Sequence, residues 1–495
     1  MVPSLKVKPL AVAVGLICAA QSALAGTSQA DLMKMIEKLN QRMERLEKRN
    51  ADLEQELRMR RAQQQAASGA DVEKRLQALE QHKEGIANGL ASDTISENEP
   101  ELTSRLKAVE TQAQGMQPVV KKLGALDGIS AGFSLTTVAQ RPTDAPGAVS
   151  QLNYRADATL SLPLEPIGDI EHKVFAHVRI GQGAGLNDIP VFGRPNSTAF
   201  RVGALPFDDS VALLAEAWYQ ADIPLPFGGF KPRSKEKLEV TFGKMDPFVF
   251  FDQNAVAGDE SRQFLNAVFV HNPLLDAGGD IGVDANGFTP GLRIAYVNDS
   301  GKPESWRASI GVLGAGAKGS NYERSLSAPT IMLQAETEQR LFGGLAGNYR
   351  IYAWNNPQAG HFDTSITNTE RHIGWGISAD QRVGDGVTLF GRYGYHVRGQ
   401  ARFDRALTLG GELNGAYWDR GADALGLAAG WLRTSEAYRS FASVGTSERV
   451  AEAYYRYRIS KQFDLSPNFQ YISHPGGDST VEAIKVFGLR AQLTY

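Results

Sequence analysis

The sequence predicts an all-β transmembrane barrel of about 16 antiparallel strands, preceded by an N-terminal α-helical coiled coil. Three observations support this fold class. The chain begins with a segment typical of secreted proteins, heptad repeats follow it, and from about Gly128 the hydrophobic pattern changes to a period of two. Single-chain barrels of the bacterial outer membrane have even strand numbers, and residues 128–495 provide turn-bounded strand patterns for about 16.

The first 25 residues predict a secretory signal peptide. Lys6 and Lys8 precede an apolar stretch from Leu10 to Ala20, and Ala23 and Ala25 fit a cleavage site after residue 25. Cys18, the one cysteine of the chain, lies inside this peptide. The mature protein is therefore expected to lack disulfides, thiol catalysis and cysteine-bound metals.

Residues 26–66 predict the coiled coil, and residues 67–127 a helical linker region. Apolar residues recur at alternating steps of four and three, surrounded by charged residues, at Leu32, Ile36, Leu39, Met43, Leu46, Leu53 and Leu57. Asn50 occupies a further seam position, where a polar side chain fixes register and oligomeric state. This pattern predicts a periplasmic oligomerisation element, with a homotrimer as one expected state. The alternative is a single amphipathic helix packed on its own domain.

Residues 128–495 predict the strands of the barrel. In the last strand, one face carries Phe487, Leu489, Ala491, Leu493 and Tyr495, and the opposite face carries Arg490, Gln492 and Thr494. The same division recurs in other segments, including 153–162, 213–220, 387–398 and 451–459. A soluble sandwich is the alternative. A secreted chain with one apolar and one charged face is better explained by a barrel in which lipid contacts one face and water the other.

Composition and motifs argue against other classes of protein. The net charge of −3 gives no basic surface for nucleic acid, and no run of about 18 apolar residues follows the N-terminus. No zinc-protease or phosphate-loop motif is present, and no GxSxG motif stands in the strand–turn–helix context of a nucleophile elbow, so neither an enzyme nor a cofactor is expected. The acidic run Asp276 to Gly287 resembles a calcium loop, but its twelfth position, where the bidentate glutamate belongs, carries no glutamate. This leaves only an adventitious Ca²⁺ as an alternative.

The inner face of the predicted barrel is charged. Ten arginines fall on it: Arg155, Arg179, Arg293, Arg307, Arg350, Arg392, Arg398, Arg456, Arg458 and Arg490. Asp157, Glu216, Glu336 and Glu452 offset part of this charge. Such groups set the selectivity of a pore, and they hydrogen-bond sugar hydroxyls, while Trp218 offers a face for stacking on a pyranose ring. The alternative is that they only line a wide aqueous pore.

One segment breaks the strand pattern. Residues 251–269 predict a short helix, because Asp259, Arg262, Gln263 and Asn266 follow a helical spacing. Phe264, Leu265 and Val268 occupy the other face. We expect this segment to fold into the barrel lumen, with its apolar face on the wall and its polar stripe narrowing the pore. A loop outside the pore is the alternative.

The segments LLAEAWYQADIPL, GKMDPFVFFDQNAVAGDESRQFLNAVFVHNP and EAYYRYRISKQFDLSPNFQYISHPGGD carry a family resemblance. Through them, residues 128–495 resemble the carbohydrate-selective porins of the OprB family. One family motif falls here on Phe251, Asp252, Asn254, Ala257, Asp259, Glu260, Gln263, Phe264, Leu265 and Asn266. The other falls on Tyr455, Arg456, Tyr457, Pro467, Gln470, Tyr471, Ile472, Pro475 and Gly476.

The resemblance implies a passive channel for small carbohydrates, such as monosaccharides, in the outer membrane of a Gram-negative cell. The coiled coil is an addition to the family pattern, and it would reach toward peptidoglycan or a periplasmic partner. Two alternatives remain open. The lumen arginines are compatible with a channel for anions or acidic sugars, and the coiled coil is compatible with an envelope tether that has an incidental pore.

Overall fold

The computed structural model describes residues 128–145, 149–186, 189–200, 210–226, 234–284, 286–314 and 327–495. The predicted signal peptide, coiled coil and helical linker lie outside the described residues, and so they stay predictions.

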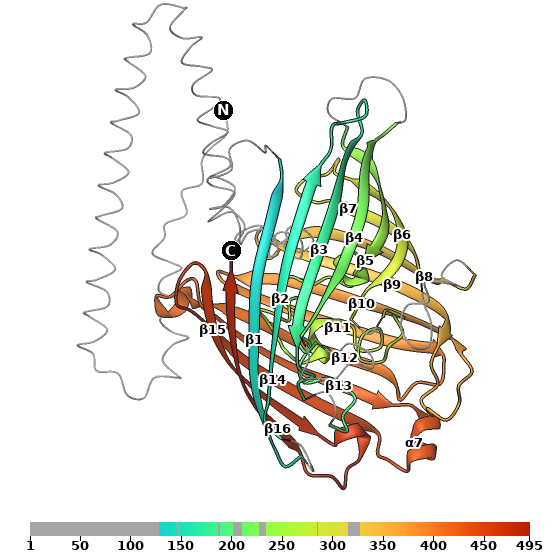
Figure 1. Ribbon diagram of the computed structural model, residues 1–495, viewed down its shortest axis with the longest axis vertical. Coiled ribbons are helices and arrows are strands. Elements are labelled where there is room, and N and C mark those ends of the chain that lie inside the picture. Colours follow the sequence, from blue (N-terminus) through green and yellow to red (C-terminus); the bar gives the residue numbers. More distant parts are fainter. Residues whose placement is uncertain are drawn as a thin grey trace, which may run out of the picture. The chain divides into compact units, whose positions relative to one another are not determined.

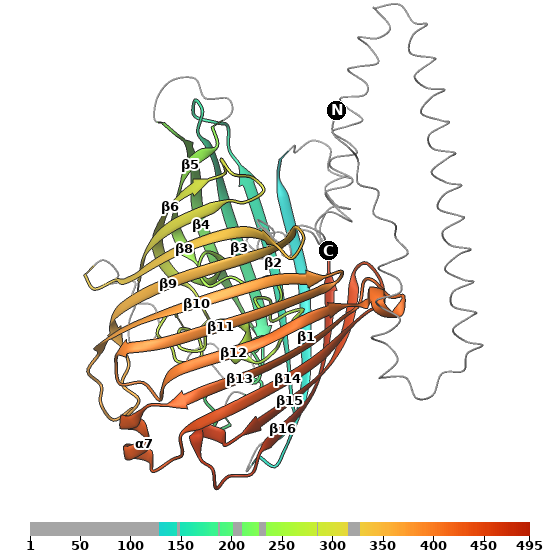
Figure 2. The ribbon, with the colours of Figure 1, turned by 180° about the vertical axis from the view of Figure 1, so that it is seen from behind.

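Sixteen antiparallel strands form one closed barrel, which confirms the predicted fold class and strand number. Each strand pairs with its neighbours in sequence, and β1 pairs with β16 to close the ring (Figures 1 and 2). The first eight strands are β1 Ser130–Thr143, β2 Gln151–Pro163, β3 Glu171–Gln182, β4 Val211–Pro224, β5 Glu236–Met245, β6 Thr289–Asn298, β7 Trp306–Leu313 and β8 Thr330–Leu341. The others are β9 Leu345–Ala359, β10 Glu370–Gly384, β11 Val387–Arg398, β12 Phe403–Asn414, β13 Ala424–Thr434, β14 Ser447–Arg458, β15 Phe463–Ser473 and β16 Ile484–Thr494.

Closure leaves no unpaired sheet edge, which a bilayer would otherwise penalise. The pairing of β1 with β16 continues to the last residue, since the backbone N–H of Phe133 donates to Tyr495 O (3.0 Å) and that of Tyr495 donates to Phe133 O (2.8 Å). No helix within the described part of the chain is long and apolar enough to cross a membrane.

The alternation of side chains between two faces is confirmed along most strands. In β16, Phe487 and Leu489 are exposed on the outer face, whereas Arg490 and Gln492 are buried inside the barrel. The outer face carries exposed apolar side chains on nearly every strand, among them Leu152, Ile180, Leu214, Leu333, Ile351 and Leu427. A hydrocarbon environment therefore suits this face, and the charged groups point away from it.

The predicted faces of β4 are wrong at its start because of a β-bulge. Leu214 pairs with Val178 and Glu216 pairs with His177, so Ala215 is an extra residue without a partner on β3. Ala215 and Glu216 are consequently both buried, and Leu214, which strict alternation with Glu216 and Trp218 would place on the polar face, is exposed on the outer face. Alternation read from the sequence slips by one residue at this point.

The two ends of the barrel differ in the length of their connections. The longest connections, 183–210, 246–288 and 314–329, all follow odd-numbered strands and therefore lie at one end, which we call the long-loop end. The opposite end, the turn end, has tight connections such as 342–344 and 385–386. In barrels of this class the longer loops are extracellular and the short turns periplasmic.

Two of these connections fold into the barrel. We call residues 246–288 the lumen segment and residues 189–200 the lumen loop. Figures 1 and 2 show the yellow-green lumen segment inside the ring of strands. The apolar core lies between the lumen segment and the barrel wall. The segment contributes Phe251, Phe264, Val268, Phe269 and Leu274, and the wall contributes residues such as Tyr352, Phe390, Leu432 and Tyr454. The expectation that Phe264, Leu265 and Val268 are buried against the wall is confirmed.

The predicted helix over residues 251–269 is wrong for most of its length. Only α6, Ala267–Val270, is helical, and Asn266 caps it by accepting from Val268 N. Residues before it form turns, in which Gln263 N donates to Asp259 O (2.7 Å), while other backbone groups bond to wall side chains. The remaining short helices are η3 Pro247–Val249, η4 Gly415–Trp418, α7 Glu436–Ala442 and η5 Pro475–Gly477.

Glycines on the wall allow the lumen segment to approach closely. A Cβ added to Gly430 on β13 would lie 2.7 Å from Val268 Cγ1, and one added to Gly394 on β11 would lie 2.5 Å from Asn272 Oδ1. Both positions therefore require the absence of a side chain for the segment to pack as it does.

Candidate functional site

The lumen segment is anchored to the wall by a buried ion pair between Asp252 and Arg392. Arg392 Nε donates to Asp252 Oδ1 (3.1 Å), and the two other guanidinium nitrogens donate to Phe269 O (2.7 Å), Asp252 O (3.1 Å) and Ala257 O (2.6 Å). Tyr352 Oη donates to the same carboxylate (2.7 Å). Asp252 also adopts a left-handed φ of 52°. This arginine therefore fixes the fold of the segment from the β11 wall.

Two glutamates of β14 hold the inserted loops through their backbone. Glu452 accepts from Leu265 N (2.6 Å) and Asn266 N (2.9 Å) of the lumen segment. Glu448, four residues earlier on the same strand, accepts from Phe192 N (2.8 Å) and Gly193 N (3.2 Å) of the lumen loop. Each carboxylate thus satisfies backbone N–H groups that have no partner within their own loop.

Two more arginines hold the remainder of the segment. Arg490 of β16 donates to the carbonyls of Glu260 (3.0 Å), Gln263 (2.7 Å) and Arg262 (2.7 Å). Arg155 of β2 forms a 2.6 Å ion pair with the Glu260 carboxylate. Because the anchors come from β2, β11, β14 and β16, the segment contacts widely separated parts of the wall. Its expected position inside the lumen is therefore confirmed.

A cluster of partly exposed groups lies on the segment and the lumen loop. The rings of Phe248 and His271 are stacked, with centroids 3.7 Å apart and planes 7° apart. His271 Nδ1 lies 3.0 Å from Asp276 Oδ2, and Arg194 of the lumen loop forms an ion pair with the same carboxylate. We call Phe248, His271, Asp276 and Arg194 the aromatic shelf. It offers a flat ring surface with a carboxylate and a guanidinium at its edge.

A basic group of side chains lies elsewhere in the lumen. Arg262 is 25% exposed and lies 3.8 Å from Asp464 of β15. Burial, followed by the repulsion of Arg456, lowers the pKa of Arg262 to about 10, so it stays protonated at neutral pH. Arg458 pairs with Asp464 at 2.8 Å, and Arg456 lies 3.5 Å from Glu412. This basic group carries more arginines than carboxylates.

Near the start of the lumen segment, Asp246 lies in an acidic environment. Its backbone N–H donates to Glu216 Oε2 (3.2 Å), and its side chain accepts from Phe248 N (2.9 Å). Burial, together with the negative charge of Glu216, raises the pKa of Asp246 to about 7. Asp246 therefore changes charge within the physiological pH range.

The structure divides the predicted pore residues into three groups. The following are buried, as anchors, caps or packed wall residues: Asp252, Asn254, Asn266, Glu216, Trp218, Arg392 and Glu452. The following are partly exposed in the lumen: Asp259, Glu260, Arg262, Gln263 and Arg456. Arg398 is exposed at the long-loop end of β11. That any of them contacts a solute stays a prediction.

Trp218 illustrates the difference between facing inward and facing the pore. Its ring stacks on Phe175 (4.7 Å between centroids) and meets Phe250 edge-on (5.8 Å), which leaves the residue 3% exposed. The predicted stacking surface is thus covered by other rings. The aromatic shelf, which sequence reasoning missed, is the more exposed one. Of the four shelf residues, only Asp276 stands out in the sequence, as the first residue of an acidic run.

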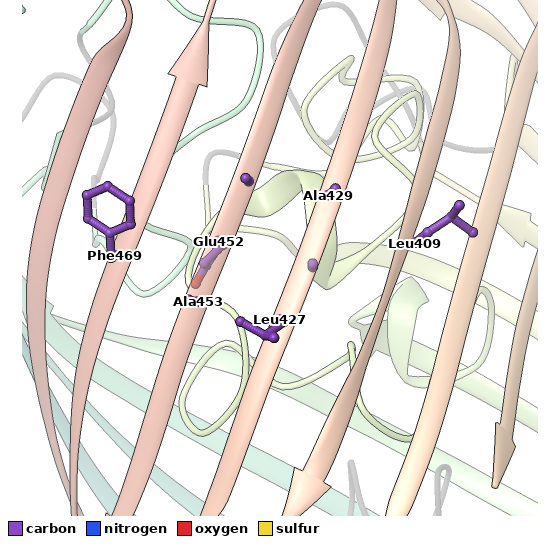
Figure 3. A pocket seen from close by; sticks show the side chains of 8 residues that line it. Leu409, Leu427, Ala429, Glu452, Ala453 and Phe469 are labelled. Carbon is purple, nitrogen blue, oxygen red and sulfur yellow. The ribbon is translucent and has the colours of Figure 1, made fainter. Parts of the chain in front are cut away.

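One surface depression lies outside the lumen. It is lined by Leu409, Leu427, Ala429, Ala453 and Phe469 on the outer face of β12–β15 (Figure 3). Leu409 and Leu427 are both more than half exposed there. Glu452 also borders it, but its carboxylate bonds to the lumen segment inside the barrel. The depression therefore belongs to the apolar outer surface and not to the pore.

Comparisons with known proteins agree with this architecture. The family model described as carbohydrate-selective porin, OprB family, matches residues 121–495. Among solved structures, one of OprB from Pseudomonas putida at high pH is similar, with a TM-score of 0.59 and 16% identity over 77% of this chain and 96% of that one. The outer-membrane channel DcaP of Acinetobacter baumannii matches with a TM-score of 0.44 and 11% identity over 74% and 97%. No curated protein sequence matched the chain.

Proposed function

Since this chain belongs to the carbohydrate-selective porins of the OprB family and is an outer-membrane channel for small carbohydrates, we propose that its solutes pass over the aromatic shelf. The supporting observation is the partly exposed stack of Phe248 and His271 with Asp276 and Arg194 at its edge. The apolar face of a sugar ring packs on an aromatic surface, and its hydroxyls bond to carboxylates and guanidinium groups.

Transport in this proposal is passive and works through weak binding. Polar groups at the shelf replace part of the water around the sugar, which lowers the free energy of the solute inside the pore. The lumen segment keeps these groups in place, because Arg392, Glu452 and Arg490 bind its backbone. Binding must stay weak so that the solute also leaves.

Substitution of the shelf tests the proposal. We expect Phe248→Leu to weaken the block of ion current by glucose-like sugars about 2- to 12-fold, as the loss of about 0.5–1.5 kcal/mol of aromatic contact implies. The current in KCl should change little, because the leucine side chain fills most of the volume of the phenylalanine side chain that it replaces. Phe441→Leu is the matched control, since Phe441 lies exposed on α7 at the long-loop end.

Liposome swelling with a panel of neutral sugars, acidic sugars and inorganic anions tests the same proposal more broadly. If glucose-like sugars neither permeate nor block the current, sugar conduction fails for this chain. If sugars permeate and Phe248→Leu changes nothing, the pore conducts sugars but the shelf does not bind them.

A second candidate, a channel for anions or acidic sugars, has its own supporting observation. Arg194 is 48% exposed, and Arg262 and Arg458 are also partly exposed. These guanidinium groups would attract carboxylates into the lumen. A swelling rate higher for acidic sugars than for neutral sugars of equal size would favour this candidate.

The expected coiled coil of residues 26–66 supports a further part of the proposal. It would lie in the periplasm, join copies of the chain into a homotrimer, and extend toward peptidoglycan or a periplasmic partner. In the strongest form of this idea, the protein is mainly an envelope tether with an incidental pore. The heptad seam with Asn50 motivates it.

A further inference from the structure

Three metal-binding side chains meet where the lumen segment joins the wall. They are Asp280, His372 and His396, and all three are buried. His372 Nδ1 lies 2.6 Å from Asp280 Oδ1, and His396 Nε2 contacts Asp280 Oδ2. One ligand atom from each residue lies within 4.8 Å of the others. We call these three residues the His–Asp cluster.

The cluster is built from three separate parts of the chain. Asp280 belongs to the lumen segment, His372 lies near the start of β10, and His396 lies near the end of β11. Both strand positions are at the long-loop end. The Asp280 carboxylate accepts from Trp354 Nε1 (2.7 Å), and its backbone carbonyl accepts from Asn356 Nδ2 (2.9 Å). The carboxylate is therefore fixed in position before any ligand arrives.

The cluster gathers carboxylates whose charge a bound cation can balance. His372 Nε2 faces Glu370 Oε1 at 3.0 Å, so both ring nitrogens of this histidine face carboxylate oxygens. The ion pairs of Asp280 and Glu370 in the described residues are formed with histidines and not with arginine or lysine. With neutral imidazoles the group carries two negative charges, and a divalent cation balances them.

The donor set indicates which cation fits. Imidazole nitrogens suit zinc and its first-row neighbours, whereas calcium and magnesium prefer sites built from oxygen. Glu370 stands where a carboxylate orients a metal-bound histidine through its other N–H. We propose that Asp280, His372 and His396 bind a zinc-class divalent metal ion, with a fourth position left for water.

Only small movements are needed to admit the ion. Two ligands of a tetrahedral zinc, each about 2.0–2.1 Å from the metal, lie roughly 3.3 Å apart. The 2.6 Å contact between His372 Nδ1 and Asp280 Oδ1 therefore opens by under about 1 Å, and the widest separation in the cluster, at most 4.8 Å, closes by at most about 1.5 Å. The Glu370 side chain is 31% exposed, which gives the site a side open to water. The bound ion would crosslink the lumen segment to β10 and β11 at the long-loop end.

Cobalt binding to the full-length protein tests the site. The protein is purified in detergent, stripped with EDTA and titrated with Co²⁺. We expect one equivalent per chain, with visible absorption bands typical of four-coordinate cobalt, and displacement by Zn²⁺. His372→Gln and His396→Gln should each weaken binding at least about 100-fold, and Glu370→Gln about 10- to 100-fold.

His361→Gln is the matched control, because His361 lies in the connection before β10 but outside the cluster. It should bind Co²⁺ as the unaltered protein does. Heat-modifiable migration on gels checks that each variant is folded, and Asp280→Asn provides a conservative variant that keeps the side-chain shape. Absence of stoichiometric Co²⁺ binding, or binding that Asp280→Asn and the histidine variants leave unchanged, would overturn the proposal.

Discussion

Asp246 gives the lumen a charge that depends on pH. Its pKa is raised from the ordinary value of 3.8 to about 7 by burial and by the adjacent charge of Glu216. A raised carboxyl pKa means that the folded protein holds a proton which the unfolded chain releases, so the contribution of Asp246 to stability falls as pH rises through about 7. The same ionisation adds a negative charge to the lumen.

We therefore predict that the preference for cations over anions rises as pH increases through about 7, and that Asp246→Asn removes this part of the change. Reversal potentials in a KCl gradient between pH 5 and 9 measure it, and subtracting the variant's profile isolates the contribution of Asp246. Asp169→Asn, in the exposed β2–β3 turn, is the control. Identical profiles for Asp246→Asn and the unaltered protein would contradict the prediction.

At the scale of single residues, sequence reasoning found the inward face but not which part of it stays exposed to water. Alternation placed Glu216, Trp218 and Arg392 inside the barrel, and the structure confirms that they are buried there. The inserted loops decide which inward side chains stay in contact with water, and no local pattern encodes that contact. For the same reason His271 was missed, since its stacking on Phe248 depends on how the 22 residues between them fold.

The lumen segment is an element whose fold depends on one wall arginine. Replacing Arg392 with methionine removes four donated hydrogen bonds and leaves Asp252 buried without its counter-charge. Breaking a buried pair in this way costs about 3–5 kcal/mol. We predict that Arg392→Met releases the segment from the β11 wall, which gives larger and noisier single-channel currents and new protease cleavage within residues 246–288.

Two causes contribute to this effect: the loss of the hydrogen bonds of Arg392 and the burial of the Asp252 carboxylate without a counter-charge. The double variant Arg392→Met with Asp252→Asn separates them, because it loses the hydrogen bonds but no longer buries the charge. We expect its currents to be less noisy than those of the single variant. Arg141→Met is the control, since Arg141 is an exposed arginine of β1. Unchanged conductance and unchanged protease resistance in Arg392→Met would show that the segment does not depend on this anchor.

At the scale of elements, the strands were predictable and the lumen segment was only partly so. Strands repeat the same two-sided environment, lipid outside and polar lumen inside, and this environment leaves a period of two in the sequence. The bulge at Ala215 left no such signal, because one inserted residue only shifts the alternation. The helical spacing of residues 259–266 was misleading, since Glu452 and Arg490 bind the backbone groups that a helix would have paired internally.

At the scale of the whole molecule, the pore and the N-terminal region are separable in the sequence. The family match begins at residue 121 and the first strand at Ser130, whereas the heptad seam with Asn50 lies far upstream. The barrel closes on itself through β1 and β16 and needs no other chain to complete its sheet. The channel and the expected oligomerisation element therefore occupy different parts of the chain.

Deletion of residues 26–120 should accordingly separate assembly from conduction. We predict that the shortened protein loses its oligomeric state by native mass measurement, while each barrel keeps its single-channel conductance and its block by sugars. Asn50→Leu is the finer variant, because removing the polar seam residue should stabilise the coiled coil and broaden its oligomeric states. An unchanged oligomer after the deletion would assign assembly to the barrel. Loss of sugar block would instead mean that the N-terminal region contributes to the pore, which the separation of the two parts along the sequence argues against.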